Sequence, residues 1–594
     1  MFTNMYPLAI LAVSASASAT AVFDQKLLGP AYPAASNLAA ASAIRATAAS
    51  ISSALGLALN SGHTPFANFT GKATSLSVQA VSALDPNGGP PILDFHYTAA
   101  ELNASAGSTR RVAADTVYRI GSVSKLFTVY ALLLHGGAAH WDRPVTDFVP
   151  ELGRAAALPG ADNAVERVQW REVTVGALAS QLSGIGRDYN NADLASQGFP
   201  WKEAGLPPLP PSEIPTCAGN SSQPPCNRKE YFEGFIKRHP VLPPYTAPVY
   251  SNAAYRILGY VVEAIAGSPY DEVLAQSVLR PLGLKKTSTT CPSGSGVGVI
   301  PPGDAGWGRP LGDEVSTGGL YSSAHDLAVF GRALLTSKQL SPFATRHWMK
   351  PHSHTAWPSA SVGPPWEIAR TRSRVTSGYA VDLYTKSGSV DQYNALLVLV
   401  PEFQVVVSLL AAGPDSGPVV EAATETVLQA LLPALDGVSQ SQACDKFCGR
   451  YAPTDAAAAA AAANSSLVLA VDDEGPGLLV TQWISNGVDV RRAAQAYADA
   501  TKGGVIESIR LYPTGLRTPG EAAFRAVLQT VPSGFDPSVQ RVLDPRASQW
   551  SAVDQLMYGE VAIDDFVFRL DGQGRAVAVE PRVLRQTIQR VGGK

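Results

Sequence analysis

The sequence predicts an α+β domain over residues 30–435, followed by an all-β domain over residues 440–594. Three observations favour this division. A chain of 594 residues is longer than one hydrophobic core normally supports. Up to about residue 435, segments with helical spacing alternate with strand-like runs that pair as a hairpin and a meander, which is typical of an antiparallel sheet with helices. Beyond Asp436, short alternating runs separated by turn residues follow.

The first domain opens with a helix and a hairpin. Residues 36–59 are rich in Ala, Leu and Ile at helical spacing, and residues 75–83 and 91–97 are typical of paired strands around a turn. An apolar segment over residues 122–135 then ends at two glycines, as helices often do. Because its faces are nearly all apolar, this helix belongs in the middle of the domain, and its first turn faces a cleft or the core.

The middle of the chain is interrupted by a long loop. Residues 187–248 are rich in Pro, Gly, Asn and Asp, and several proline pairs break any regular element. Loops of this length inside compact domains are usually functional lids or poorly ordered insertions. Helical spacing resumes at residues 252–266. Three strand-like runs at residues 384–390, 394–400 and 404–413 form the meander, and a final helix over residues 419–432 completes the domain.

The first residues indicate export from the cell. A short apolar run followed by Ala-x-Ala cleavage sites is typical of a signal peptide, here over residues 1–21, while the absence of an early Lys or Arg leaves a disordered tail as the alternative. No later stretch reaches the roughly 18 uninterrupted apolar residues that cross a bilayer. We therefore expect a secreted protein with no membrane partner. Four triplets are candidate glycosylation sites, beginning at Asn68, Asn103, Asn220 and Asn464.

Charge and cysteine content bear on the binding partners and on possible disulfides. A formal net charge of -3 without clustered Lys or Arg predicts no nucleic-acid partner. Cys217 and Cys226 bracket a Pro- and Asn-rich loop, so a disulfide there would limit the freedom of the chain. Cys444 and Cys448 form a second close pair, and Cys291 is expected to be a buried thiol.

A serine and a lysine lie three positions apart at the start of the central apolar helix. Ser122 and Lys125 therefore share one helical face and can touch. A serine hydroxyl is a poor nucleophile until a base removes its proton, and a lysine can be that base if burial or a neighbouring cation lowers its pKa. The helix N-terminus also favours the negative charge that develops on attack. As a bare pattern, however, Ser-x-x-Lys also arises by chance.

A tyrosine and an asparagine open the second apolar helix. In Tyr250-Ser251-Asn252 the phenol can pass protons, and the Asn252 amide can hold a lysine and a substrate amide in register. The alternative interpretation is a helix N-cap, in which Ser251 or Asn252 satisfies free backbone N–H groups.

The third pattern, Lys386-Ser387-Gly388, lies on the first strand of the meander. Lys386 would supply a cation that attracts a substrate carboxylate and lowers the pKa of Lys125 or Tyr250. Gly388 would allow the close approach of a substrate backbone. The alternative is a solvated lysine that protects an edge strand against aggregation.

In this order and context, the three patterns resemble the serine β-lactamases and D-Ala-D-Ala peptidases. Tyr-x-Asn in place of Ser-x-Asn makes the chain similar to the class C β-lactamase and D-aminopeptidase/esterase branch, over residues 44–432. The resemblance implies an antiparallel sheet flanked by helices, with an all-helical lobe. It also implies Ser122 as nucleophile, Lys125 and Tyr250 as proton carriers, Asn252 as a positioning residue, and the backbone N–H groups of Ser122 and Ser389 as an oxyanion hole.

The chain departs from this family pattern at Ser387, where threonine is commoner, and the substitution keeps the hydroxyl. Several esterase relatives carry His or Trp at the position of Lys386, so its retention favours substrates with a carboxylate. The all-β domain resembles the barrel-like C-terminal domain of secreted fungal β-lactamase-like proteins and of some D-aminopeptidases.

We therefore expect a secreted serine hydrolase that cleaves an amide, lactam or ester bond of a small molecule or short peptide through an acyl-enzyme on Ser122. The alternatives are an acyltransferase of secondary metabolism that uses the same acyl-enzyme, and an inactive homologue that binds a ligand. The sequence has no Gly-x-Ser-x-Gly elbow, which excludes an α/β-hydrolase. His347, His352 and His354 match no catalytic zinc spacing, so we predict neither a metal nor another cofactor.

Overall fold

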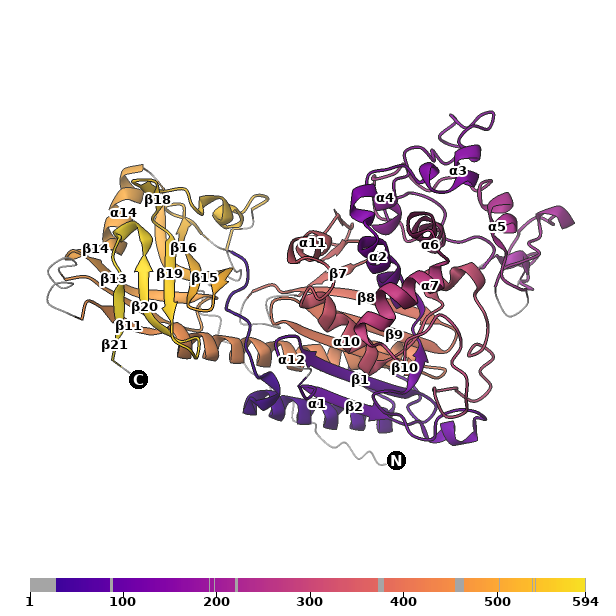
Figure 1. The fold of residues 1–594 in the computed structure, drawn as a ribbon, viewed down its shortest axis with the longest axis horizontal. Helices are drawn as coiled ribbons and strands as arrows, with labels where there is room; N and C mark the ends of the chain where they lie inside the picture. Colours follow the sequence, from indigo (N-terminus) through magenta and orange to yellow (C-terminus); the bar gives the residue numbers. More distant parts are fainter. Residues whose placement is uncertain are drawn as a thin grey trace, which may run out of the picture. The chain divides into compact units, whose positions relative to one another are not determined.

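A computed structural model describes residues 28–592 of the chain, except residues 86–88, 192, 197, 220–222, 372–378, 455–463, 502, 537 and 540. The predicted signal peptide and the glycosylation triplet at Asn220 lie outside the described residues. The chain divides into two compact units (Figure 1). The large unit spans residues 32–445, and the small unit comprises residues 28–31 and 446–592 of the described chain.

An eight-stranded antiparallel sheet forms the centre of the large unit, in the order β2-β1-β10-β9-β8-β7-β6-β5. The predicted hairpin is confirmed as β1 and β2, and the predicted meander as β8 to β10. Every residue of β1 and of β10 is buried, because helices cover both faces of the sheet there. The strands are β1 (Ser75–Ser82), β2 (Leu93–Tyr97), β5 (Ser353–His354), β6 (Ala360–Val362), β7 (Glu367–Arg370), β8 (Asp382–Val390), β9 (Tyr393–Val400) and β10 (Val405–Ala412). A separate two-stranded ribbon pairs β3 (Val117–Arg119) with β4 (Tyr321–Ser323).

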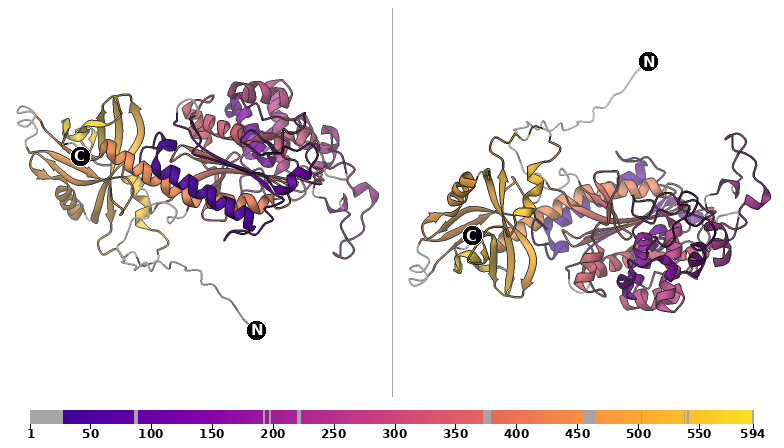
Figure 2. Two further views of the ribbon diagram at one scale, coloured as in Figure 1. Left: turned by 90° about the horizontal axis from the view of Figure 1, so that it is seen from below. Right: turned by 90° about the horizontal axis from the view of Figure 1, so that it is seen from above.

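Three long helices cover the sheet. Helices α1 (Ser42–Ser61) and α12 (Ser416–Phe447) lie side by side along one face, and α10 (Ala324–Leu335) packs against the other (Figure 1, Figure 2). Within the described residues, α1 is the one helix whose length and apolar composition would suffice to cross a membrane, a criterion that core helices also meet. One side of α1 is buried, with Ile44 and Leu55 among its buried residues.

Helix α12 continues well beyond the helix predicted at residues 419–432. It runs through Pro433 and ends at Phe447. A proline inside a helix removes a hydrogen-bond donor and normally kinks or ends the helix. Leu435 and Ala443, which follow it, are nonetheless buried. Burial of this side of the helix therefore outweighs the local cost of Pro433.

A helical lobe completes the large unit (Figure 1). The short 3₁₀ turn η4 (Gly121–Val123) leads into α2 (Ser124–Leu134), whose residues from Ser124 to Leu132 are all buried, as the apolar pattern predicts. The helix predicted at residues 252–266 is confirmed as α6 (Asn252–Ala266). The remaining helices of the large unit are α3 (Pro150–Ala155), α4 (Val175–Ala179), α5 (Arg228–Phe235), α7 (Tyr270–Leu274), α8 (Arg280–Leu282), α9 (Val315–Gly318) and α11 (Pro342–Trp348).

The proline-rich segment at residues 187–248 contains a helix that its composition does not predict, α5. A capping box starts this helix: Asn227 and Glu230 each accept a hydrogen bond from the other's backbone N–H. The aromatic residues of α5, among them Tyr231 and Phe235, are buried and hold it against the lobe. Local capping and aromatic burial therefore override the loop-forming composition around the helix.

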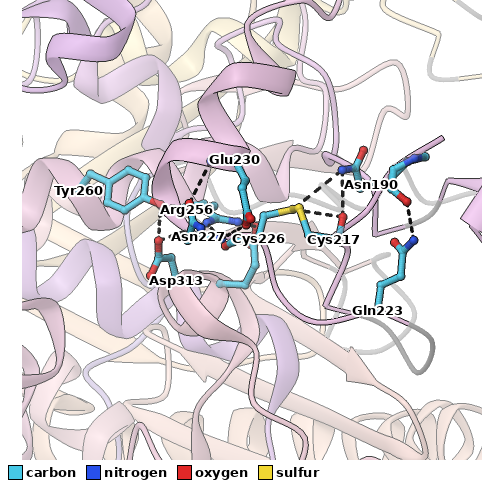
Figure 3. The surroundings of a disulfide bond; sticks show 11 residues. Asn190, Cys217, Gln223, Cys226, Asn227, Glu230, Arg256, Tyr260 and Asp313 are labelled. Atoms are coloured by element: carbon cyan, nitrogen blue, oxygen red, sulfur yellow. Dashed lines mark hydrogen bonds and ion pairs between the residues drawn. A yellow bond between two sulfur atoms is a disulfide. The ribbon is translucent and has the colours of Figure 1, made fainter. Parts of the chain in front are cut away.

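The predicted cysteine pairs are both oxidised. Cys217 and Cys226 form a disulfide just before α5, and Cys444 and Cys448 are disulfide-bonded as well. The first disulfide lies beside Arg256 of α6, whose guanidinium donates a hydrogen bond of 2.8 Å to the Cys226 carbonyl (Figure 3). The expectation for Cys291 is wrong: this free thiol is exposed, because it lies in a surface loop rather than in the core.

Eight antiparallel strands of the small unit close into a barrel, in the order β12-β11-β21-β20-β19-β16-β15-β13, with β12 pairing back to β13. A short strand, β14 (Val488–Asp489), extends the sheet beyond β13, and helix α14 (Val490–Thr501) follows it. The rings of Phe447, Phe524 and Phe568 pack together in the core. The barrel strands are β11 (Gly449–Ala452), β12 (Ser466–Ala470), β13 (Leu478–Ser485), β15 (Val505–Thr518), β16 (Glu521–Val531), β19 (Asp565–Leu570), β20 (Ala576–Pro581) and β21 (Ile588–Val591). The predicted α+β fold with a barrel-like second domain is thereby confirmed.

Candidate active site

Ser122 lies where the turn η4 meets strand β8. Gly121 has a positive φ of 49°, and a side chain there would lie 2.6 Å from the backbone nitrogen of Ser389. A Cβ at Gly388 would lie 2.0 Å from the carbonyl oxygen of Ile120 and 2.8 Å from the backbone nitrogen of Ser122. Glycine is required at both positions so that turn and strand can touch. The backbone N–H groups of Ser122 and Ser389 therefore lie at one junction.

Lys125 is fully buried and points back along α2 to the serine. Its ammonium donates three hydrogen bonds: 2.9 Å to Ser122 Oγ, 2.8 Å to Asn252 Oδ1 and 2.9 Å to the carbonyl oxygen of Thr317. Burial lowers the pKa of the Lys125 ammonium, Lys386 lowers it further, and Tyr250 opposes both effects. Lys125 can therefore lose its proton more easily than an ordinary lysine.

Tyr250 contacts the same two groups. Its phenol interacts with the side chains of Ser122 and Lys125. The ammonium groups of Lys125 and Lys386 lie 5.1 Å and 5.3 Å from the centre of its ring. Burial raises the pKa of the Tyr250 phenol, but the two cations outweigh it, so the pKa lies below the usual value. Serine, lysine and phenol thus form one connected group for proton transfer.

The two interpretations of Tyr250-Ser251-Asn252 apply to different residues of the triplet. Ser251 is the N-cap of α6, because its side chain accepts a hydrogen bond of 3.0 Å from the Ala254 backbone N–H. Asn252 is thereby free to face the site. Its carbonyl oxygen accepts from Lys125, and its amide nitrogen donates 2.8 Å to Asp188 Oδ1. Asp188, whose role no pattern in the sequence predicts, therefore fixes the orientation of the Asn252 amide.

Lys386 and Ser387 are also at the site, but they already bind a carboxylate of this chain. The Lys386 ammonium donates 2.5 Å to Glu367 Oε1 and 2.8 Å to the Ser387 carbonyl. The backbone N–H and the hydroxyl of Ser387 each donate 2.8 Å to Glu367 Oε2. Burial raises the pKa of the Glu367 carboxyl, but Lys386 outweighs it and holds that pKa below its usual value. The alternative of a solvated edge lysine is wrong, because the Lys386 side chain is 1% exposed.

Two cavities meet at Ser122. Ser122, Asn252 and Ser389 line both, one of about 290 Å³ and the other of about 640 Å³. The smaller cavity is bordered by Asp188 and by the loop around the Cys217–Cys226 disulfide, and the larger by Tyr250, Glu367 and part of α12. Ser122 itself is partly exposed, so a substrate carbonyl can approach its hydroxyl.

The histidines considered for a metal site have other partners. His352 shares a hydrogen bond of 2.9 Å with Ser180 Oγ, and His354 one of 3.1 Å with Ser361 Oγ. In the part of the chain that the structure describes, no three His, Cys, Asp or Glu side chains are grouped so that they could hold a metal ion.

Comparison with known families agrees with this arrangement. The family described as Beta-lactamase matches residues 67–432, and the family described as Beta-lactamase-like-like, C-terminal domain, matches residues 439–592. The chain belongs to the β-lactamase family, within the superfamily of serine β-lactamases and penicillin-binding proteins, whose members are serine hydrolases.

Individual relatives cover nearly the whole chain. A beta-lactamase-like protein of Arthroderma benhamiae is 31% identical over 541 residues, 87% of each chain. A probable hydrolase M10 of a Phoma species is 26% identical, over 86% of this chain and 84% of its own. Among solved structures, D-amino acid amidase of Ochrobactrum anthropi is 16% identical, with a TM-score of 0.46, and covers 65% of this chain and 98% of its own.

Proposed function

We propose that this protein is a secreted serine hydrolase that cleaves amide, lactam or ester bonds through an acyl-enzyme on Ser122. The observation that carries the proposal is the hydrogen bond of 2.9 Å between Lys125 Nζ and Ser122 Oγ, in a cleft where Tyr250 contacts both groups. A nucleophile and a base within hydrogen-bond distance are what covalent catalysis by serine requires.

Acylation begins when the Lys125 and Tyr250 pair, in its basic form, takes the proton of Ser122. The Ser122 oxygen then attacks the substrate carbonyl carbon, and the bond to the leaving group breaks after a tetrahedral intermediate. The backbone N–H groups of Ser122 and Ser389 donate to the oxyanion of that intermediate. The pair returns its proton to the leaving group, and in deacylation the same pair takes a proton from the attacking water.

The cysteines support the proposal of secretion. Both close pairs are oxidised, and structural disulfides persist mainly in extracellular and other oxidising compartments. The cysteines of each pair are close in the sequence, so the disulfides stabilise local structure rather than the whole fold.

Covalent labelling tests the proposal directly. We expect a fluorophosphonate probe to add one mass increment to the intact protein, located by peptide mapping at Ser122. Ser122→Ala should abolish the adduct and lower hydrolysis by roughly 1,000-fold or more. Ser53→Ala, on the exposed side of α1, should label like the wild type. An adduct on another residue, or none on a folded sample, would favour the inactive ligand-binding homologue instead.

A further inference from the structure

Three donors of strand β8 converge on one carboxylate. Lys386 Nζ, the Ser387 backbone N–H and the Ser387 hydroxyl bind both oxygens of Glu367 at 2.5 to 2.8 Å. Lys386 is the group that the sequence predicts to attract a substrate carboxylate. In the structure, the anion they hold belongs to the protein.

The position of Glu367 explains why it can reach these donors. Glu367 is the first residue of β7, and it pairs with Thr385 at the point where the pairing of β7 with β8 ends. Its side chain is 36% exposed and lines the larger cavity together with Ser122 and Tyr250. The carboxylate therefore extends past the end of the β7–β8 ladder into the space beside the nucleophile.

Other charges around this cavity do not favour a second anion. Glu421 and Glu425 of α12 line it as well, and so does Arg187. Arg187 forms an ion pair of 3.4 Å with Asp188, which reduces its positive charge toward a substrate. A substrate carboxylate entering here would have to displace Glu367 from its three donors or share one ammonium with it, and like charges side by side are strongly unfavourable.

We propose that Glu367 is a specificity-determining residue that fills the anion site of Lys386 and Ser387, so that the enzyme selects acyl donors without a carboxylate in the leaving group. This inference rests on the proposed function and names its substrate class: uncharged esters, thioesters and amides. This inference replaces the prediction from sequence that Lys386 favours carboxylate substrates, because the ammonium already binds a carboxylate of the protein.

Two matched thioesters test the proposal on the full chain. Hippuryl thioglycolate carries a carboxylate in its leaving group, and hippuryl thioglycolamide carries an uncharged amide at the same place. Release of the free thiol gives kcat/KM for each. We expect the wild type to prefer the amide. In Glu367→Gln, kcat/KM for the carboxylate thioester divided by kcat/KM for the amide thioester should rise on the order of 30-fold. The reason is that one like charge is removed and Lys386 is left without its counter-ion. Comparing ratios between variants cancels the different chemical reactivity of the two thioesters.

Glu421→Gln is the matched control, since it makes the same chemical change in the same cavity on an exposed residue. We expect it to change the ratio by less than about 3-fold, because an exposed charge is well screened. An equal effect of both variants would mean that general charge in the cavity, and not occupation of the β8 site, sets the preference, and it would overturn the proposal.

The remaining outcomes separate this inference from the proposed function. If Glu367→Gln is labelled at Ser122 at the wild-type rate by the uncharged fluorophosphonate but keeps the wild-type ratio, the specificity role is wrong and the hydrolase remains. If the wild type itself prefers the carboxylate thioester, the proposal is wrong even where the variant fails to fold. If the wild type neither reacts with the thioesters nor is labelled, the hydrolase and the inference both fail.

Discussion

At the scale of single residues, the reactivity of Ser122 depends on how cations and burial set two pKa values. Lys386 lowers the pKa of Lys125 and of Tyr250. Its ammonium donates its hydrogen bonds to Glu367 and to the Ser387 carbonyl instead. Its ammonium lies 5.3 Å from the centre of the Tyr250 ring. Lys386 therefore acts on the proton carriers through its charge.

Replacing this cation should change the pH profile of the enzyme. Removing a nearby positive charge raises the pKa of Lys125 and of Tyr250, so their basic forms appear only at higher pH. In Lys386→Met we expect the rising limb of kcat/KM against pH to move upward by about one unit, measured with an uncharged thioester. In Glu367→Gln/Lys386→Met, which removes both charges of the pair, the shift should keep its sign but be smaller. A profile that does not move in either variant would contradict this role of Lys386.

The residues of the site differ in how well the sequence could reveal them. Ser122 and Lys125 share a helical face by their spacing alone, and Asn252 opens a helix with recognisable periodicity. Thr317 contributes a carbonyl oxygen of the main chain, which no side-chain pattern reveals. Glu367 lies in a four-residue strand whose pairing with β8 is set by tertiary contacts, so nothing near it in the sequence links it to Lys386.

At the scale of elements, boundaries were predictable where local signals and burial agree. Helix α6 has the predicted bounds, because its N-cap serine and terminal glycine coincide with its apolar stripe. Helix α12 passes through Pro433, where the local signal and the burial of later residues disagree. Helix α5 was missed because the segment around it is rich in Pro, Gly, Asn and Asp. Asn227 and Glu230 nevertheless have the spacing of a capping box, a signal that would have found the helix.

The disulfide before α5 should stabilise one wall of the cleft. Cys217 and Cys226 are 9 positions apart, and closing a loop of that length contributes about 2.5 kcal/mol through the entropy of the unfolded chain. In Cys217→Ala/Cys226→Ala we expect faster limited proteolysis between residues 187 and 248, and a higher KM at nearly unchanged kcat, because Cys226 lines the smaller cavity while the proton carriers are elsewhere.

The free thiol provides the control for this experiment. Cys291→Ala removes an exposed cysteine that forms no disulfide, and it should leave both proteolysis and KM at their wild-type values. Equal proteolysis of the double variant and the wild type would show that packing of α5, and not the disulfide, holds the loop.

At the scale of the whole molecule, the chain contains two separately packed units. Residues 446–592 close their own barrel around aromatic residues such as Phe524 and Phe568, and residues 32–445 pack around the sheet and α2. The sequence pattern changes near residue 436, close to this division. The position of the boundary could not be predicted, because α12 continues to Phe447. Ser122, Asn252 and Thr317, which accept hydrogen bonds from Lys125, belong to the large unit, as does Tyr250.

Because the nucleophile and its partners lie in the large unit, a ligand of Ser122 should stabilise that unit alone. We expect calorimetric unfolding to show two transitions. Phenylboronic acid, which bonds reversibly to an activated serine, should stabilise one of them by about 2.7 kcal/mol at 100 times its Kd, since it binds the folded site and not the unfolded chain. The other transition should keep its temperature. In Ser122→Ala, phenylboronic acid should shift neither transition. A common shift of both transitions, or a single transition throughout, would show that the barrel and the catalytic unit unfold as one cooperative body.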